Sequence, residues 1–416
     1  MAKYLFQKTA VTALALCYVI AQVPALAQNS ILTLNAAIEQ AQARAPAVAG
    51  ALASVRAADA SVQVARARPN PSLGIEAENV LGSGRYARFS GGDETFSISV
   101  PIDLGGKREA RTQVAEAERD AAAVGVSTSR ADLTLKVTQA FIGVVANQHR
   151  LELAKTSLEL AERAAKVARE RVSAGKASPI DQQRAEVMRI NAQVKADRAA
   201  RAVGTASSTL ARLLGNPALA TISAPWFDET VGTPGALPDG RPLGLVAADA
   251  DISAAQARVT AARRARVPDV TLSVGARRFG DSHDRAAVLS LSVPLPIFNN
   301  GSGELARAHA ELDRAEATRA TVLLDTEQGM VEAQSDVANA LAAAEAAGPA
   351  LAAAGEAARI ARIGYAAGKF SQLDLIEAER ALTESREASI DALAALHEAR
   401  ARLARLKGST ASLYKD

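Results

Sequence analysis

The chain has 416 residues, of which 48 are Lys or Arg and 45 are Asp or Glu, so its net charge is only +3. This near balance gives no electrostatic case for nucleic-acid binding. Aromatic residues make up just 3 % of the chain, and its abundance of Ala, Arg and Glu is typical of long packed helices rather than of one globular core.

The first 27 residues have the pattern of a secretory signal peptide. Lys3 and Lys8 precede an apolar run from about residue 9 to residue 23. Ala25-Leu26-Ala27 then forms a small-x-small cleavage site. We therefore expect residues 1–27 to be removed during export.

The single cysteine lies inside this segment, which raises the alternative of a lipoprotein. Leu16 precedes Cys17, where lipidation requires a small residue, so we do not expect lipidation. The mature chain then contains no cysteine and forms no disulfide, and its stability must come from packing and assembly. Beyond the signal we find no apolar run of 18 or more residues, so we expect no membrane-spanning helix, and entry into a bilayer would have to be by strands.

The mature chain begins with a predicted helix over residues 34–67, interrupted near Pro46. A hairpin of two strands follows on either side of a Gly-rich loop, since apolar residues alternate with polar or small ones at positions 73–77 and 96–102. Strands of about ten residues are long enough to cross a bilayer when tilted.

A long helix is predicted over residues 108–172, with an apolar seam that recurs every seven residues at Leu151, Leu158, Ala165 and Val172. At about 1.5 Å per residue it is on the order of 100 Å long, more than a single globular domain covers. Gly175 ends this helix, and a return helix of about half the length runs over residues 180–214. A looser segment rich in Gly and Pro follows and contains Trp226.

The same plan then returns. We expect a helix over 247–266, alternating strands at 270–276 and 289–295, a long helix over 304–363 bent at Gly348-Pro349, and a last helix over 373–406. Three landmarks recur 193 residues apart: Val100-Pro101 with Val293-Pro294, Gly175 with Gly368, and Ala211-Arg212 with Ala404-Arg405. This spacing indicates an internal duplication.

The chain is therefore divided into a signal peptide (1–27), a first repeat (28–215), an equatorial linker segment (216–245), a second repeat (246–408) and a C-terminal tail (409–416). Four amphipathic strands cannot close a barrel, because about eight is the smallest known number. An open sheet edge in lipid leaves backbone groups unpaired at several kcal/mol each. Copies of the chain must therefore contribute strands to one shared barrel. The short helix before the other hairpin is expected to stack end to end on each return helix.

The export signal, the duplicated plan and the Gly-x-x-x-x-x-Asp turns at Gly175 and Gly368 resemble a TolC-type outer membrane efflux protein. The stretch from Pro101 to Arg108, Pro-Ile-Asp-Leu-Gly-Gly-Lys-Arg, further resembles the CzcC-like branch that serves heavy-metal cation pumps. The resemblance implies a mainly α fold with a transmembrane β-barrel. Three protomers would share a 12-stranded barrel in the outer membrane, continuous with a long α-helical barrel that crosses the periplasm.

The resemblance also implies partners. The homotrimer would dock on a periplasmic adaptor (a membrane fusion protein) and a proton-driven inner-membrane pump of the RND type, as a passive exit duct for divalent heavy-metal cations with no chemistry of its own. Two alternatives remain open. One is a drug or solvent efflux channel. The other is a non-channel periplasmic coiled-coil adaptor, which would carry a soluble barrel or lipoyl-like domain in place of the four alternating strands.

The family has acidic residues at its periplasmic entrance, and Asp374 and Glu377 match them. They lie one helical turn apart on one face, so copies converging on one axis would repel one another and raise some of their pKa values. The first-repeat counterpart of Glu377 is Arg184, so the repeats differ there. Alternatively, Asp181 and Asp374 simply cap the helices that follow the two turns.

Tyr365 matches a tyrosine that bonds across to the acid at the position of Asp181 in the family, so these two residues are a candidate latch. The alternative is aromatic packing at a helix end. The family often adds a basic residue two positions beyond the glycine, where this chain has Phe370, so a salt-bridged latch is not expected.

The turns themselves are candidate adaptor contacts at the tunnel tip: Gly175, Lys176, Gly368 and Lys369. The alternative is a solvated lysine beside a helix-ending glycine. Glu76 and Glu78 alternate with apolar residues and would face the barrel lumen.

No catalytic or cofactor site is expected. The four histidines, His149, His283, His309 and His397, are scattered and have no His or Cys neighbours, whereas a metal site needs clustered ligands. We find no catalytic triad and no P-loop, and we expect no bound cofactor and no metal.

Overall fold

The computed structural model describes residues 31–84, 86, 91–217, 220–230, 240–409 and 414. The predicted signal peptide and Cys17 lie outside these residues, as do parts of the predicted linker segment and tail. The division of the chain at those predicted boundaries stays a prediction.

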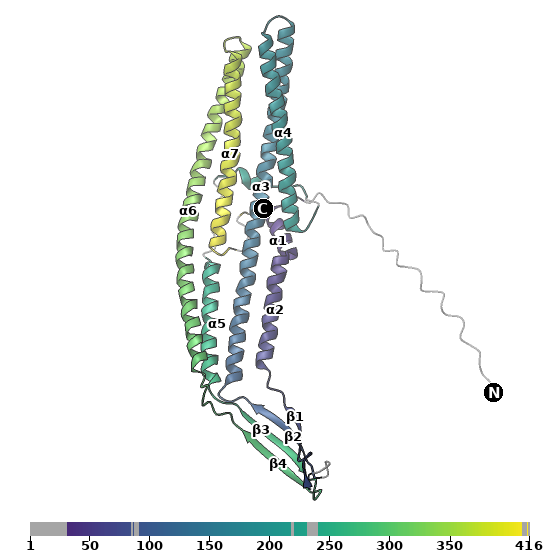
Figure 1. Cartoon of the computed structure of the whole chain (residues 1–416). Coiled ribbons are helices and arrows are strands. Elements are labelled where there is room, and N and C mark those ends of the chain that lie inside the picture. The colour runs from purple at the N-terminus through teal and green to yellow at the C-terminus, as the bar shows by residue number, and fades with distance from the viewer. Residues whose placement is uncertain are drawn as a thin grey trace, which may run out of the picture.

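The element order follows the predicted plan, run through twice (Figure 1). The elements are α1 (Leu34–Arg44), α2 (Pro46–Arg66), β1 (Ser72–Glu78), β2 (Asp93–Ile102), α3 (Lys107–Ser173), α4 (Pro179–Leu214), the short 3-10 helix η2 (Pro225–Asp228), α5 (Leu243–Ala265), β3 (Val270–Arg278), β4 (Arg285–Ser292), α6 (Ser302–Ala366) and α7 (Gln372–Leu406).

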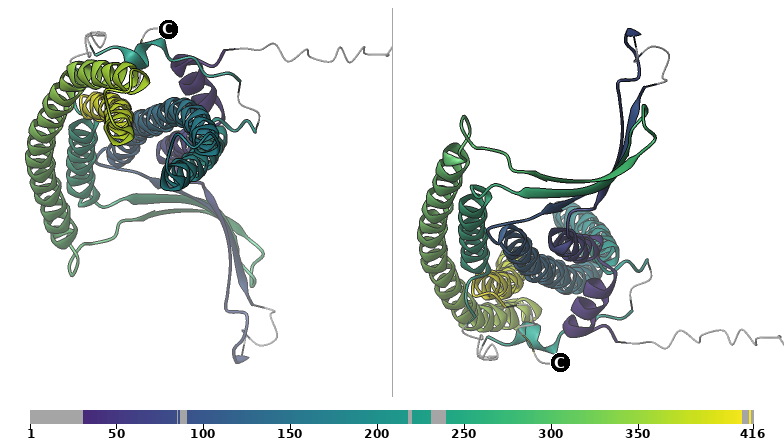
Figure 2. Two further views of the ribbon diagram at one scale, coloured as in Figure 1. Left: turned by 90° about the horizontal axis from the view of Figure 1, so that it is seen from above. Right: turned by 90° about the horizontal axis from the view of Figure 1, so that it is seen from below.

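The molecule is a long helical rod with a small sheet at one end and two helical hairpin tips at the other (Figure 1). The helix α3 has 67 residues and α6 has 65, which makes each about 100 Å long. Seen from below, the sheet sweeps away to one side of the helices (Figure 2).

Pro46 was expected to interrupt a helix and Pro349 to bend one, and the two prolines act differently. Pro46 stands at the first position of α2, where its missing N–H costs nothing, and Ala45 in an extended conformation separates α1 from α2. Pro349 instead lies inside α6, which runs on without a break. Figure 1 shows α6 bowed along its length rather than sharply bent at one point.

Each return helix is continued by the helix that precedes the hairpin of its own repeat, not of the other repeat as we expected. Below α4 lie α1 and α2, and below α7 lies α5 (Figure 1). At the first joint, Arg44 at the end of α1 donates to the carbonyl of Gly215, the residue that ends α4. At the second, Gly408 after α7 lies so close to Arg241, just before α5, that a Cβ would stand 2.7 Å from its carbonyl oxygen.

The main hydrophobic core lies at the level of the first joint and joins α1, the middle of α3, the end of α4 and the linker segment. Trp226 stacks on Tyr414, with ring centroids 4.0 Å apart and planes 9° apart. His397 of α7 lies edge-on to Trp226 and is fully buried. Its Nδ1 lies 2.7 Å from the Tyr414 hydroxyl and its Nε2 lies 2.9 Å from the carbonyl oxygen of Phe227. The segment we expected to be loose thus supplies the centre of the core.

The strands form one antiparallel sheet in the order β1-β2-β3-β4. Its register sets apolar side chains beside apolar ones across all four strands, as in the row Leu73, Ile98, Val274 and Leu289. The alternate row of Ser99, Ser273 and Ser290 is polar, and Ser99 and Ser273 hydroxyls lie 2.8 Å apart. The sheet therefore has one apolar and one polar face, with β1 and β4 as its edges.

One described helix, α6, is long and apolar enough to cross a membrane by length and composition, and little of its most apolar stretch is buried. This differs from our expectation of no such run. The stretch is rich in alanine, whose small side chains suit close helix packing, and α6 packs along its length on α5 and α7.

The buried histidine predicts a pH-dependent stability. Burial is the main cause that lowers the pKa of His397 from 6.5 to about 4. The unfolded chain therefore binds a proton more readily than the folded chain between these values, so stability falls as pH drops from about 6.5 to about 4 and then levels off. The loss is on the order of 3 kcal/mol. Thermal unfolding midpoints of the detergent-solubilised protein across this range should show it.

The variant His397→Gln should show a weaker pH dependence than the wild type. His149→Gln is the matched control, because His149 stacks on Phe227 at the edge of the same cluster, and it should keep the wild-type dependence. Equal pH dependence in His397→Gln and the wild type would contradict this account.

Candidate functional site

The two hairpin tips are built in the same way. Gly175 and Gly368 both have a φ of 69°, a left-handed conformation that glycine adopts without strain. After each glycine, the backbone N–H of a lysine closes the helix end: Lys176 donates to Arg171 at 2.8 Å and Lys369 donates to Gly364 at 2.8 Å. Both lysines are exposed. The four predicted adaptor-contact residues therefore lie together at one end of the molecule.

The helices that leave the tips start with a capping box at Ser178 and at Ser371. Asp374 accepts hydrogen bonds from the Ser371 hydroxyl and the Ser371 backbone N–H, both at 2.8 Å. The hydroxyl and then the N–H lower the pKa of Asp374 below its usual 3.8. Asp181 likewise accepts from the Ser178 N–H, at 3.2 Å. Asp181 and Asp374 therefore both cap helices, which is the alternative that we gave to a role in the gate.

Glu377 differs from Asp374 although it is only one turn away. Its side chain is exposed, and it lies outside the capping box that engages Asp374. Within one chain, Asp374 and Glu377 occupy the tip of α7, whereas Asp181 occupies the tip of α4. The expected rise in pKa through mutual repulsion is not seen for Asp374 in the single chain, where hydrogen bonding lowers its pKa instead.

The two hairpins are joined by a contact that the sequence did not predict. The guanidinium of Arg171, on α3, donates to the hydroxyl of Tyr365, on α6, at 2.8 Å. The guanidinium carbon also lies 5.6 Å from the centre of the Tyr365 ring. Within the chain, Tyr365 is therefore held by Arg171 and not by Asp181. A cation–aromatic contact at an exposed site contributes only about 0.5–1 kcal/mol, so this Arg171–Tyr365 clasp is easily opened.

Phe370 fills the position where the family often has a basic residue, and its ring packs over Gly364. A Cβ on Gly364 would lie 2.1 Å from a ring carbon of Phe370. Gly364 is therefore required for the ring to lie flat against α6. Nearby, Arg362 and Glu379 form an ion pair that ties α6 to α7 (Nη2 to Oε2, 2.8 Å).

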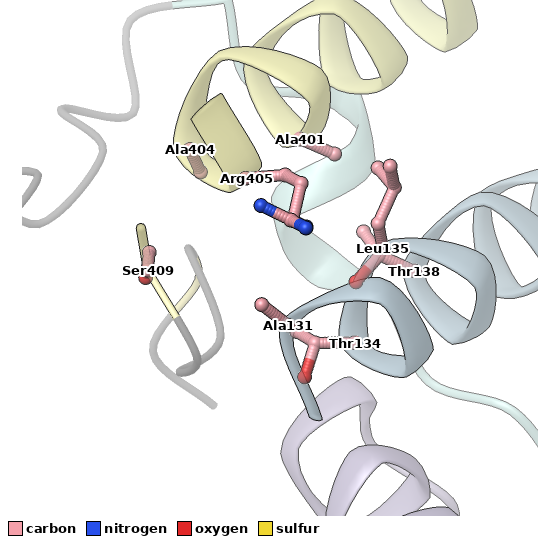
Figure 3. A pocket seen from close by; sticks show the side chains of 8 residues that line it. All are labelled: Ala131, Thr134, Leu135, Thr138, Ala401, Ala404, Arg405 and Ser409. Atoms are coloured by element: carbon pink, nitrogen blue, oxygen red, sulfur yellow. The ribbon is translucent and has the colours of Figure 1, made fainter. Parts of the chain in front are cut away.

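A small cavity lies between α3 and the end of α7 (Figure 3). Its lining residues are Ala131, Thr134, Leu135, Thr138, Ala401, Ala404, Arg405 and Ser409. Its volume is about 10 Å³, room for about one water molecule. Figure 3 shows Arg405 reaching between the helices, where its Nε donates to Asp132 at 2.7 Å. The cavity is a packing gap rather than a ligand site.

The histidines lie far from the tips and serve different surroundings. His397 is buried in the core, His149 stacks on its edge, His283 stands in the turn between β3 and β4, and His309 is exposed on α6. Among the described residues, no group of three His, Cys, Asp or Glu side chains is arranged to hold a metal ion.

Residues 37–216 and 241–409 match the family described as "Outer membrane efflux protein". The cobalt-zinc-cadmium resistance protein CzcC of Cupriavidus metallidurans is 30 % identical over 390 residues, which cover 91 % of this chain and 90 % of the relative. The nickel-cobalt-cadmium resistance protein NccC of Alcaligenes xylosoxydans xylosoxydans is 32 % identical over 308 residues, which cover 72 % of this chain and 69 % of the relative.

Among solved structures, the open state of the MtrE outer membrane channel of Neisseria gonorrhoeae matches with a TM-score of 0.75 and 20 % identity. The match covers 91 % of this chain and 89 % of that chain. At this identity the likeness concerns the fold, and it agrees with the predicted fold class.

The clasp between the hairpins can be tested by the distance between the tips. Spin labels on cysteines introduced at Lys176 and Lys369 report this distance. Arg171→Ala should broaden the distance distribution, because it removes both the hydrogen bond and the ring contact. Tyr365→Phe should broaden it less, because the ring remains.

Arg163→Ala is the matched control, since Arg163 lies two turns along α3 and donates to Glu159 of its own helix at 3.2 Å. It should leave the distribution unchanged. A wild-type distribution in Arg171→Ala would show that the clasp does not hold the hairpins together.

Proposed function

The chain belongs to the outer membrane efflux protein family, and from that premise we propose that it is the exit duct through which divalent heavy-metal cations leave the cell. The observation that carries the cation assignment is the near full-length likeness to a cobalt-zinc-cadmium resistance protein. The likeness to a nickel-cobalt-cadmium resistance protein supports the same class of substrate. The resemblance of the stretch from Pro101 to Arg108 to the heavy-metal branch of the family supports the same class of substrate.

Family membership sets aside the alternative of a non-channel adaptor, because the chain is an outer membrane efflux channel. A passive duct needs no reaction centre, and the family is one of channels. The drug or solvent alternative concerns only the cargo, which the first experiment below decides.

Three copies would close the barrel. Both edge strands, β1 and β4, offer a row of backbone groups with no strand beside them among the described residues of the single chain. In lipid such groups cost several kcal/mol each when unpaired. Pairing β4 of one copy with β1 of the next removes both edges, and three copies supply the strands of a closed barrel. The polar face of the sheet would then line the lumen.

The charged residues on the polar face of the sheet support its orientation toward the lumen. Glu76 and Glu78 share it with Arg277, whose guanidinium pairs with Glu78 at 2.7 Å and donates to the Thr95 hydroxyl at 2.9 Å. These groups are satisfied by one another and by water in a lumen, whereas on the lipid side they would be costly. They solvate the passage.

The tips would form the periplasmic entrance and the adaptor contact. Gly175, Lys176, Gly368 and Lys369 present two exposed turns of the same shape to a periplasmic adaptor, with an inner-membrane pump beyond it. Between the tips, the clasp of Arg171 with Tyr365 would keep the entrance narrow. Glu377, exposed and free of the capping box, would supply most of the cation attraction, while Asp374 mainly caps α7 and Asp181 caps α4.

Deletion of the gene tests the cargo. Tolerance of the cell to divalent cobalt, zinc, cadmium or nickel should fall, while tolerance to dyes and antibiotics should not change, because the duct serves a cation pump. Growth at graded concentrations measures both. The opposite pattern would assign the channel to drug or solvent efflux.

The role of the acids at the tip is tested by cation block of the reconstituted pore. Glu377→Gln should weaken the block by added divalent or trivalent cations, because a ring of carboxylates at a narrow mouth focuses the field and attracts cations. Asp374→Asn should mainly lower thermal stability, because it removes the charge of the carboxylate that accepts from Ser371 in the capping box at the start of α7. Tyr365→Phe should raise single-channel conductance and leave the block intact.

Glu332→Gln is the control for charge alone, because it removes the same charge from the middle of α6, far from the tip. It should leave the block at the wild-type level. If Glu377→Gln channels are blocked as readily as wild-type channels, Glu377 does not line the entrance.

A further inference from the structure

A short apolar segment joins the sheet to α6, and its side chains contact almost nothing in the chain. Phe298 is fully exposed, and Leu295 and Ile297 are exposed by 74 % and 75 %. These three residues are called the apolar linker below. Exposing apolar surface to water costs about 25 cal/mol for each Å² of accessible area. We therefore expect lipid or another protein surface to cover these three side chains.

The backbone of the apolar linker is fixed at both ends. The Ile297 N–H donates back to the Leu295 carbonyl at 2.9 Å. At the far end, the side chains of Asn299 and Asn300 accept from the backbone N–H groups of Gly301 and Ser302, both at 3.0 Å, and start α6. The apolar side chains are therefore presented outward by a defined conformation.

A hydrogen bond to α5 also holds the end of the apolar linker in place. The Arg266 Nε donates to the carbonyl of Asn300 at 3.1 Å. Gly301, with a φ of 72°, lies so close to the Arg266 side chain that a Cβ would stand 2.9 Å from its Cγ. The apolar linker is thus clamped between β4 and the end of α5, with Pro294 and Pro296 unable to donate to a neighbouring strand.

The first repeat has only part of such a segment: Ile102 stands opposite Leu295 and Leu104 opposite Ile297, and they are exposed by 42 % and 39 %. At the constant spacing of 193 residues, Asp103 stands opposite Pro296 and Gly105 opposite Phe298. The junction there is charged: Asp103 pairs with Arg111 at 2.9 Å, and Lys107 pairs with Asp269 at 2.8 Å. The fully exposed ring of Phe298 is therefore a feature of the second repeat alone.

We propose that the apolar linker inserts into the periplasmic leaflet of the outer membrane and extends the lipid-facing band of the barrel toward the helices. The inference rests on the outer membrane location of the protein. Its first support is continuity: the apolar face of the sheet reaches Leu289 and Leu291 on β4, both well exposed, and the chain runs from there directly into Leu295.

The second support is the height of the apolar face. Toward the loop end it stops at a charged row formed by Glu94, Arg278 and Arg285. From Ala287 on β4 to Val293 just after its end, the extended chain rises only about 20 Å, or about 15 Å along the membrane normal at a tilt of about 40°, whereas outer membrane barrels present an apolar band of about 25 Å. The apolar linker supplies the missing height.

The third support is the boundary that follows. Directly after Phe298 the chain becomes polar at Asn299 and Asn300, and Arg266 lies against them. This is the order of groups expected at the water boundary of a leaflet, where an aromatic ring precedes polar and basic side chains. A second copy of the chain is the other candidate cover, and the experiment distinguishes it.

Tryptophan fluorescence in vesicles tests the proposal. Trp226 is the only tryptophan, so Trp226→Phe gives a dark background that keeps an aromatic ring in the core. In this background Phe298→Trp is the test position and Ile297→Trp a second one. Leu291→Trp, on the apolar face of the sheet, is the lipid control. Leu373→Trp, an exposed apolar position at the opposite tip, is the water control.

The assembled protein is reconstituted in phosphatidylethanolamine and phosphatidylglycerol vesicles, with acyl chains brominated either near the head group or near the chain end. Emission from position 298 should shift to the blue and be quenched most by bromine near the head group. Emission from position 291 should be quenched as well, and emission from position 373 should not.

Unquenched emission from positions 298 and 297, with position 291 quenched, would overturn the proposal. If that unquenched emission is blue-shifted, a neighbouring copy covers the apolar linker. If position 291 is also unquenched in assembled protein, the sheet itself is not in lipid, and the barrel proposal fails together with the inference.

Discussion

A helix about 100 Å long is stable only where another helix covers its apolar seam, and this constraint shapes the whole chain. The helix α3 is covered over half its length by α4 and over the other half by α1 and α2, and α6 is covered in the same way by α7 and α5. In each repeat the return helix ends at a glycine, Gly215 or Gly408, and the short helix continues from there along the long helix. The aromatic core around Trp226 and His397 lies at the level of the first joint, where the seam would otherwise be open.

Elements that depend on local sequence patterns could be predicted. Contacts between segments far apart in the sequence could not. Heptads, alternating strands and Gly turns are set by neighbours in sequence, so the order of elements and the interruption at Pro46 followed from them. Which short helix continues α4 depends on how two hairpins are arranged in space, and there the expectation was wrong. Trp226 was expected in a loose segment, because a Gly- and Pro-rich composition hides the few apolar residues that a core uses.

The candidate site shows the same division. The capping boxes could be foreseen from Ser and Asp three positions apart, and the structure contains them. Arg171 could not, because nothing in sequence separates it from the other exposed arginines until the register of α3 against α6 is known. Within one chain, Asp374 and Glu377 share the tip of α7, whereas Asp181 lies at the tip of α4. The entrance that we propose would lie between copies, so each copy would hold only some of its residues.

The difference between the two tips has a consequence for symmetry. The backbone turns at Gly175 and Gly368 are alike, but one is followed by Arg184 and the other by Glu377. A trimer of such chains has hairpins that approximate sixfold symmetry in shape while keeping only threefold symmetry in charge. A binding partner that recognises the turn itself finds two equivalent places per chain, whereas one that recognises the acidic tip finds one. The number of partner molecules bound per chain therefore shows whether the partner recognises the backbone turn or the acidic tip.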